Sequence, residues 1–148
     1  MTKYDTQTPY IASYVIVRRE GKIAFLLRSN TQWMNGYYGL PSGKIEKNEN
    51  AVEAASREAL EEAGISVKVE DLKFVHVVHR HMETDWVDFY FEAENYSGTV
   101  RNAEPEVHGE LNWFELNDLP ENLLDYIRSA LGHIDSGATY SQYGWDAS

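Results

Sequence analysis

The sequence contains no cysteine, no long apolar run and few basic residues. The absence of cysteine excludes disulfide bonds and thiolate chemistry. No apolar stretch approaches the roughly eighteen residues of a membrane-spanning helix, and the opening MTKYDTQTPY is too polar for the core of a signal peptide. We therefore expect a cytoplasmic protein without a membrane partner.

Positive charge is scarce. Thirteen lysine and arginine residues face 24 aspartate and glutamate residues, which gives a formal net charge of −11. Because contacts to a nucleic-acid backbone depend on lysine and arginine, no nucleic acid is expected as a partner. A small phosphorylated ligand would need a local source of positive charge, such as a divalent cation held by carboxylates.

The composition is that of a folded chain. Apolar residues make up 43% and charged residues 25% of the 148 positions, so we expect one domain, residues 1–148. Its end, about 132–148, forms a tail rich in aromatic residues, with Tyr140, Tyr143 and Trp145. Exposed aromatic residues would leave much apolar surface in water. We expect the tail to dock on its own domain or on a partner subunit, and a homodimer is one outcome of this.

Local patterns predict a mixed sheet covered by helices, which is an α+β arrangement. β-branched and aromatic runs indicate strands at 10–19, 22–28, 65–69, 72–80, 86–93 and 111–115, the first two joined by a tight turn. Good helix formers over 50–63, followed by Gly64, predict a first helix, and a second is expected at about 121–131.

The first helix carries three close carboxylates, Glu58, Glu61 and Glu62. Residues three and four apart are neighbours on a helix, so these like charges oppose helix formation unless water or a cation compensates them. On the helical wheel they occupy an arc of roughly 100°. The stripe expected to pack on the sheet is Val52, Ala55, Ala59, Leu60 and Ala63.

The segment GKIEKNENAVEAASREALEEAGI, residues 43–65, closely resembles the Nudix box at every polar and glycine position. Two departures are a small residue, Ala59, at an apolar position and Ser42 in place of the commoner glycine of the preceding loop. The resemblance implies an α/β/α sandwich with a mixed sheet. It also implies hydrolysis of a phosphoanhydride bond in a nucleoside diphosphate linked to another moiety, X.

The same resemblance implies a metal site. Its ligands would be Glu58, Glu61, Glu62 and the backbone carbonyl of Ser42, binding Mg²⁺ or alternatively Mn²⁺. Oxygen ligands of this kind suit hard divalent cations. Arg57 lies four residues from Glu53 and from Glu61, a spacing that predicts ion pairs orienting the cluster. Glu49 is expected to have a structural role at the helix entrance.

A general base is less narrowly assigned. The loop AEPEVHGEL offers Glu104, Glu106 and Glu110, and Glu106 best matches the distance at which relatives place a further acidic residue. We therefore take Glu106, Glu58 and Glu61 as candidate catalytic carboxylates, together with Arg57. An ordinary loop carboxylate is an equally good interpretation of Glu106.

Aromatic residues before GLPSG suggest where a base could stack. Trp33 and Tyr38 are the candidate substrate-binding residues, although packing of the loop on the sheet explains such residues as well. The histidines His76, His79 and His81 do not predict a zinc site, because strand alternation puts the first on the opposite face from the other two.

The moiety X is assigned only by elimination. The chain has no proline between Pro41 and Pro105, whereas ADP-ribose-cleaving relatives tend to carry one about fifteen residues past the box. Markers of dinucleoside polyphosphate and NADH cleavage are also not evident. A nucleoside triphosphate is the leading substrate. A nucleotide sugar, ADP-ribose and a catalytically silent nucleotide-binding domain remain alternatives.

Overall fold

The computed structural model describes residues 5–145. In chain order its elements are β1 (Tyr10–Arg19), β2 (Lys22–Arg28), β3 (Tyr38–Gly39), β4 (Ser42–Lys44), α1 (Ala51–Ala63), the 3-10 helix η1 (Val69–Asp71), β5 (Leu72–Met82), β6 (Thr84–Ala93), β7 (His108–Glu115), α2 (Asp125–Asp135) and β8 (Tyr140–Tyr143). The first hairpin forms as predicted. Its turn places Glu20 and Gly21 at φ values of 51° and 79°, a pair that fits the twist of a two-residue hairpin.

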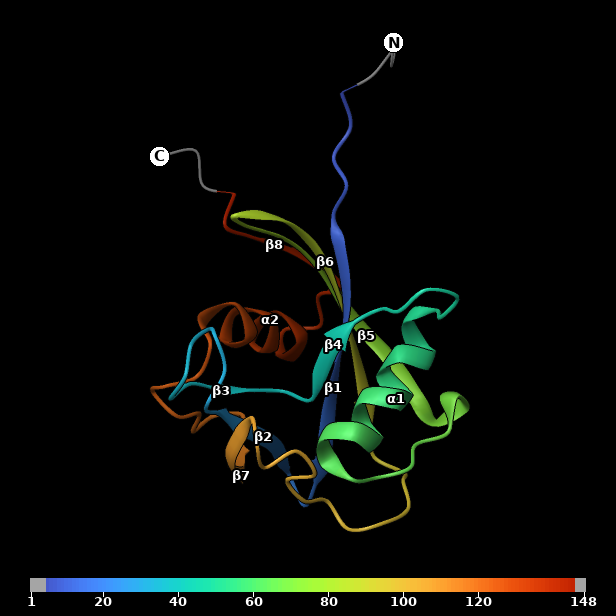
Figure 1. The fold of residues 1–148 in the computed structure, drawn as a ribbon, viewed down its shortest axis with the longest axis vertical. Helices are drawn as coiled ribbons and strands as arrows, with labels where there is room; N and C mark the ends of the chain where they lie inside the picture. Colours follow the sequence, from blue (N-terminus) through green and yellow to red (C-terminus); the bar gives the residue numbers. More distant parts are fainter. Residues whose placement is uncertain (1–4, 146–148) are drawn as a thin grey trace.

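The eight strands form one mixed sheet with the order β3-β2-β1-β6-β5-β8, in which β4 also pairs with β1 and β7 with β2 (Figure 1). Strand β1 is central and pairs with three other strands. It runs parallel to β6, and it pairs antiparallel with β4 near its start and with β2 at its end. This arrangement holds β4, which carries Ser42 and Gly43, beside the N-terminal half of β1.

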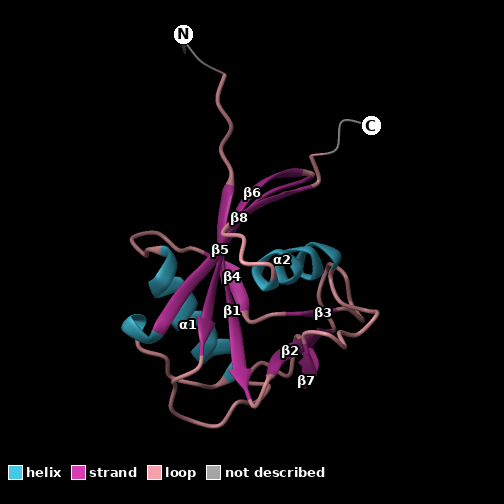
Figure 2. Cartoon of the chain, turned by 180° about the vertical axis from the view of Figure 1, so that it is seen from behind, coloured by secondary structure: helices cyan, strands magenta, loops and turns pink. Residues whose placement is uncertain are grey.

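The two helices lie on opposite faces of the sheet (Figures 1 and 2). The alternation of β1 explains this, because Tyr14 and Ile16 join the apolar cluster under α2 while Val15 and Val17 join the cluster under α1. Each face of the sheet therefore buries its own core. The predicted α/β/α sandwich with a mixed sheet is confirmed.

Helix α1 packs through small side chains. Ala55, Ala59 and Ala63 are buried as expected, but the prediction for Leu60 is wrong, since Leu60 is 54% exposed. Glu58 is turned inward instead and is 6% exposed. On a helix, the side chains of residues i and i+2 point about 200° apart. Because Glu58 points toward β4, Leu60 points to solvent.

Two predicted elements differ from the structure. Residues 65–69 do not form a strand: one isolated bridge joins Ser66 to Ser97, and η1 follows. The second helix begins at Asp125 rather than about 121, because residues 122–124 are held extended against β3. There Tyr38 N–H donates to the Asn122 carbonyl and Leu124 N–H donates to the Tyr38 carbonyl.

The aromatic tail docks on the chain's own sheet. Residues 140–143 form β8, which pairs in parallel with β5 from Val77↔Tyr140 to Arg80↔Tyr143. Beneath this strand, the buried His76 ring contacts the Ala138 carbonyl at 2.8 Å and the Ser141 hydroxyl at 2.7 Å. The last part of the predicted tail, 146–148, lies outside the described residues.

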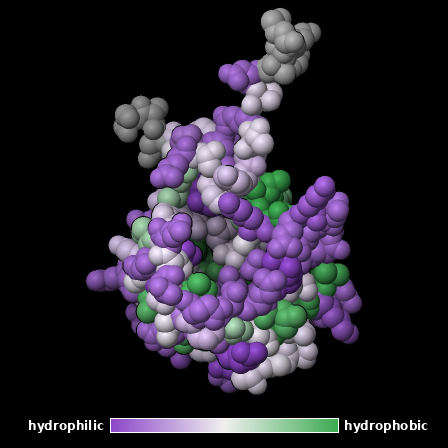
Figure 3. Space-filling model, in the orientation of Figure 1, coloured by the Kyte–Doolittle hydropathy of each residue, from purple (hydrophilic) through white to green (hydrophobic). Residues whose placement is uncertain are grey.

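Hydrophilic side chains dominate the surface over α1 in Figure 3, with smaller apolar groups around them. No helix within residues 5–145 has the length and apolar character needed to cross a membrane.

Candidate active site

The ends of α1 are fixed by local sequence. The Asn50 side chain accepts a hydrogen bond from Glu53 N–H, and the Glu53 carboxylate accepts one from Asn50 N–H, which completes a capping box. At the other end Gly64 adopts φ 71° and its N–H donates to the carbonyls of the last turn. The capping box engages the Glu53 carboxylate. The predicted ion pair between Glu53 and Arg57 does not form.

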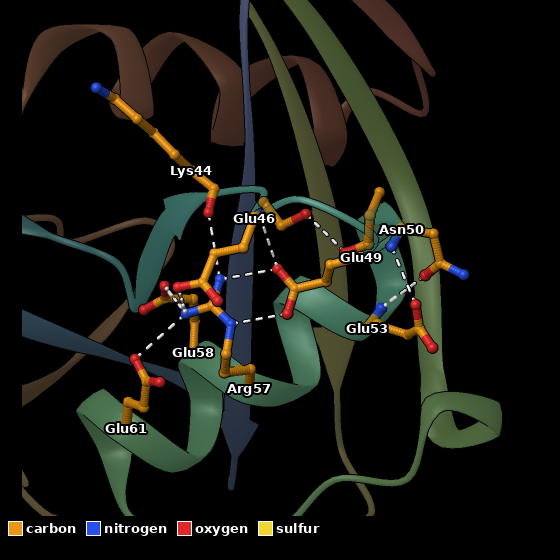
Figure 4. Close-up of polar contacts among 10 residues, drawn as sticks. Lys44, Glu46, Glu49, Asn50, Glu53, Arg57, Glu58 and Glu61 are labelled. Carbon is orange, nitrogen blue, oxygen red and sulfur yellow. Dashed lines mark hydrogen bonds and ion pairs between the residues drawn. The ribbon is translucent and has the colours of Figure 1, made fainter.

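Arg57 is the centre of the polar network at the helix entrance (Figure 4). Its guanidinium donates to both oxygens of Glu49 at 2.8 and 2.9 Å, and to the Lys44 carbonyl at 3.2 Å. It also reaches Glu58 at 2.7 Å and Glu61 at 3.3 Å. The bidentate contact lowers the pKa of Glu49. Arg57 therefore ties the loop before α1 to two carboxylates of the helix.

Glu58 lies directly against the glycine that opens the motif. A Cβ built on Gly43 would overlap the Glu58 carboxylate, so only glycine lets the carboxylate approach the β4 backbone this closely. Burial raises the pKa of Glu58 to about 7, although the adjacent Arg57 works in the opposite direction. The desolvation cost exceeds the help from one arginine.

Glu62 is held one helical turn further on. Its Oε1 accepts a hydrogen bond from Ser42 N–H at 2.9 Å. The pKa of Glu62 is raised to about 8. Burial is the largest cause and the charges of Glu58 and Glu104 act in the same direction, while the Ser42 N–H and Arg28 lower it. The serine that departs from the usual glycine is accommodated because Ser42 lies in strand β4.

The backbone of Ser42 faces the helix and not β1. The flanking residues take the ladder positions: Val15 N–H donates to the Pro41 carbonyl, and Ile45 N–H donates to the β1 backbone. Residues of an antiparallel pair alternate between hydrogen-bonded and non-hydrogen-bonded positions, so the carbonyl of Ser42 is free of the β1 ladder and points to the side of Glu62.

A third side of this acidic cluster comes from Glu61 and the loop before β7. The Glu61 side chain is 48% exposed. Glu104 is half-buried, and burial followed by the charges of Glu106 and Glu61 raises the pKa of Glu104. Glu104 also acts on Glu58 and Glu62, whereas Glu106 is exposed and is not among the charges acting on them. Of the loop carboxylates, Glu104 is therefore the one whose charge raises the pKa values of Glu58 and Glu62. Motif spacing did not indicate this role.

The oxygen donors of the acidic cluster suit a divalent cation only after side chains rearrange. Within residues 5–145, no three histidine, aspartate or glutamate side chains stand close enough to hold one ion together. Arg57 engages Glu58 and Glu61, and Ser42 engages Glu62. The chemistry still fits Mg²⁺, since the donors are all oxygen and the nearby arginines do not fully compensate the buried carboxylates, whose pKa values stay raised. The partly exposed Glu61 would have to rotate to join the other two.

A cavity of about 600 Å³ opens beside β4. Its wall includes Ser42, Gly43 and Lys44 from the start of the motif, together with cationic and aromatic side chains from other elements: Tyr10, Tyr14, Arg28, Trp33, Arg80, Trp86 and Tyr126. Lys44 Nζ lies 4.1 Å from the centre of the Tyr10 ring, and the Arg28 guanidinium lies 5.2 Å from that of Trp33. The cavity thus combines flat aromatic walls with three cations.

The two predicted substrate-binding residues are placed differently. Trp33 lines the cavity, is 41% exposed and lies 6.4 Å from Tyr126 between ring centres. Tyr38 does not line it. Tyr38 is buried edge-to-face on Phe114 and its hydroxyl accepts a hydrogen bond from Asn112. Tyr38 is therefore a packing residue, because β3 turns its ring into the core.

Sequence reasoning missed most of the cavity. Arg28, Lys44 and Arg80 stand at the ends of three different strands, and only the strand pairing brings them together. One signal was available for Arg80: the sequence has opposite charges at residues 80 and 88, on the two strands that flank the turn at Glu83. Arg80 is opposite Trp86, and Asp88 lies two positions further along that strand on the same face. Such diagonal neighbours are within reach of a long side chain.

Comparison with known proteins agrees with this geometry. The family model described as NUDIX domain matches residues 8–134. The uncharacterized Nudix hydrolase YvcI of Bacillus subtilis is 25% identical over 138 residues, which cover 85% of this chain and 84% of YvcI. The NAD-capped RNA hydrolase NudC of Escherichia coli is 32% identical over 112 residues, which cover 76% of this chain but 42% of NudC. The chain thus spans less than half the length of NudC.

Solved structures show the same fold. The MutT NUDIX hydrolase of Burkholderia pseudomallei superposes with a TM-score of 0.77 at 32% identity, covering 85% of this chain and 98% of that one. A MutT protein of Methanosarcina mazei Go1 also gives 0.77, at 24% identity, over 90% and 97% of the two chains. With the family model matching most of its length and the motif folded onto α1 beside the cavity, the chain belongs to the Nudix hydrolase family.

Proposed function

We propose that this Nudix hydrolase cleaves a phosphoanhydride bond in a nucleoside diphosphate linked to X, and that its main substrate is a nucleoside triphosphate, releasing pyrophosphate. The observation that carries the proposal is the meeting of two features at β4. The wall of the cationic and aromatic cavity includes Ser42, Gly43 and Lys44, and the carboxylates of α1 contact the same strand. A ligand in the cavity would reach the carboxylates with its phosphates.

The local charge suits an anionic ligand despite the net charge of −11. Arg28 lies close enough to Glu62 to lower its pKa, and Lys44 follows Gly43 directly. Such cations offset the acidic side chains where phosphates would approach. No nucleic-acid partner is part of the proposal, because contacts to a nucleic-acid backbone depend on many lysine and arginine residues, and the net charge of this chain is −11.

The proposed cofactor is Mg²⁺, with Mn²⁺ as the alternative, held by Glu58, Glu61, Glu62 and the Ser42 carbonyl. When bound, the metal would neutralise diphosphate charge and lower the pKa of a coordinated water. Arg57 positions the carboxylates through its contacts to the helix and to the preceding loop.

The general base is proposed to be a carboxylate that does not hold the metal during proton transfer. The candidates from sequence are Glu106 and whichever of the helix residues Glu58 and Glu61 is then not a metal ligand. Glu104 joins them because its charge reaches Glu58 and Glu62. A base must lie within hydrogen-bond reach of the attacking water, so replacement of each carboxylate by glutamine is the way to separate them.

Other substrates are the alternatives within the same chemistry. A nucleotide sugar or ADP-ribose would present the same diphosphate to β4, and a silent domain would bind a nucleotide without cleaving it. A single domain acting in the cytoplasm, where nucleotides and Mg²⁺ are abundant, completes the proposal. A homodimer is compatible with it but is not required, since the cavity is built from one chain.

The test is direct. Purified protein with Mg²⁺ is given nucleoside triphosphates, nucleotide sugars, ADP-ribose and dinucleoside polyphosphates, and the nucleotide and pyrophosphate products are separated. Metal-dependent turnover of a triphosphate that disappears in Glu62→Gln, with unchanged far-UV dichroism, is expected. Preference for another compound would reassign X. Nucleotide binding with no turnover of any compound would favour the silent domain.

A further inference from the structure

Arg80 forms a buried ion pair at the wall of the cavity. Its Nε and Nη2 donate to the two oxygens of Asp88 at 2.6 and 3.1 Å, and Nη2 also donates to the Tyr14 hydroxyl at 3.3 Å. Arg80 is 4% exposed and Asp88 is fully buried. The Asp88 carboxylate compensates the charge of the guanidinium and fixes its orientation.

One nitrogen of this guanidinium is left with only a weak partner. Arginine has five N–H donors. Within residues 5–145 the only hydrogen-bond acceptor near Nη1 is the Met82 sulfur, at 3.6 Å. A thioether is a weak acceptor. Arg80 and Met82 both line the cavity, so a ligand with a better acceptor can take up the Nη1 donors.

Flat rings enclose the same guanidinium. It lies 4.1 Å from the centre of the Tyr126 ring and 4.6 Å from that of Trp86. Contacts to aromatic faces and to Asp88 leave the group little freedom to rotate. It is therefore a preorganised donor, which loses little entropy when it binds.

Arg80 does not act on the carboxylates of the motif, although it shares the Trp86 ring with Lys44 and lies near Tyr126, as Arg28 does. Arg28 contributes to the pKa of Glu62, whereas Arg80 is not among the charges acting on Glu62 or Glu58. The charge of Arg80 acts instead on the tyrosines and on Asp88. Phosphates held near Arg28 and β4 would thus leave the other part of the ligand to face Arg80.

From this geometry we infer that Arg80 is a specificity-determining residue that selects a 6-oxopurine base over adenine, an inference that rests on the proposed nucleotide substrate. A compensated, rigid donor suits a neutral acceptor better than a second phosphate, because Asp88 would repel a phosphate. A planar base fits aromatic walls. A 6-oxopurine presents the carbonyl oxygen O6 as an acceptor, and the Nη1 donors of Arg80 can take it up, whereas adenine has an amino donor in place of O6.

The experiment compares inosine and adenosine nucleotides, which differ at the 6-position. Values of kcat/KM are measured for the two triphosphates with Mg²⁺, and dissociation constants for the two monophosphates are measured by calorimetry. Wild type is expected to favour the inosine member by about tenfold or more in both readouts. Monophosphate binding does not depend on turnover, so it tests the inference even if hydrolysis is absent.

The variant must not leave Asp88 buried without a partner. The double substitution Arg80→Gln with Asp88→Asn keeps a neutral hydrogen-bonded pair, and its melting temperature shows whether it folds. The inosine preference should fall to less than threefold. As a matched control, Arg28→Gln, at the phosphate end, should weaken binding of both nucleotides while the preference persists.

The outcomes separate the two proposals. Turnover with equal use of both bases, or activity confined to pyrimidine nucleotides, would overturn the inference and leave the hydrolase intact. An inosine preference in monophosphate binding without turnover would support Arg80 while the proposed hydrolysis fails. A preference that survives in the folded double variant would also overturn the assignment to Arg80. If neither monophosphate binds and no nucleoside triphosphate, purine or pyrimidine, is hydrolysed, both proposals fail.

Discussion

Without divalent metal, the free energy of unfolding of this protein should fall as the pH rises. In the folded chain the pKa of Glu62 is about 8 and that of Glu58 about 7, both raised from 4.5 by burial. An unfolded chain holds neither proton above pH 6.5. The folded state therefore binds more protons than the unfolded state, and its stability must fall as the pH passes through these values.

The size of the effect follows from the two pKa values. Integrated between pH 6.5 and 8.5, proton release from Glu62 and Glu58 costs about 2–3 kcal/mol of unfolding free energy. For a domain of this length, that corresponds to a fall in melting temperature of about 5–10 °C. The buried His76 and His108, whose pKa values are lowered by burial, act in the opposite direction, because the unfolded chain still releases their protons just above pH 6.5. Each offsets at most about 0.4 kcal/mol, so they reduce the fall in stability without reversing its sign.

Thermal melts in EDTA at pH 6.5, 7.5 and 8.5 measure this slope, and parallel melts with Mg²⁺ should show the larger stabilisation at pH 8.5, where the carboxylates are ionised. Glu62→Gln is the matched control, because the amide keeps an acceptor for Ser42 N–H and cannot ionise. It should lose most of the slope. A metal-free melting temperature that is constant or rises from pH 6.5 to 8.5 would refute the reasoning.

Three further outcomes are expected. Gly43→Ala should displace the Glu58 carboxylate, lowering kcat at least tenfold and stability by about 1–3 kcal/mol, and wild-type kinetics would contradict the close approach. Deletion of 138–148 should expose the edge of β5 and unpair His76, so dichroism and melting should show a loss of about 2–4 kcal/mol and not a change of assembly alone. Trp33→Ala should raise KM about tenfold with little change in kcat if the ring stacks on a base.

Residues close to the ends of α1 were sufficient to predict the bounds of this helix. Asn50 and Glu53 cap the helix and Gly64 ends it, and each acts within a few residues of its own position, so the sequence predicted 50–63 and the structure has Ala51–Ala63. The spacing of the glutamates likewise decides which of them share a turn. What spacing could not decide is which carboxylate is buried, since that depends on how close α1 approaches Gly43.

The cavity depended on strand pairing across the chain. Arg80 meets Tyr14 and Tyr126 only because β1, β6 and β5 are neighbours and because the register of β5 on β6 turns its side chain to the face that α2 covers. A shift of one residue reverses which side chains face a given side of a sheet. No local pattern contains that information, and for the same reason the sequence could not decide between packing and ligand contact for Tyr38, whose ring lies in the core.

The charge of the protein illustrates how a total can mislead about a site. A formal charge of −11 argues against binding phosphate at a distance, but charges beyond about 8 Å in solvent are largely screened at physiological salt. What a diphosphate would meet at β4 is decided by nearer groups: Arg28 and Lys44 on one side, and on the other the two buried carboxylates of raised pKa. Those carboxylates oppose an anion unless a cation joins them. We therefore expect the acidic helix to make the proposed activity dependent on metal, while the cations of the cavity would favour binding of the nucleotide.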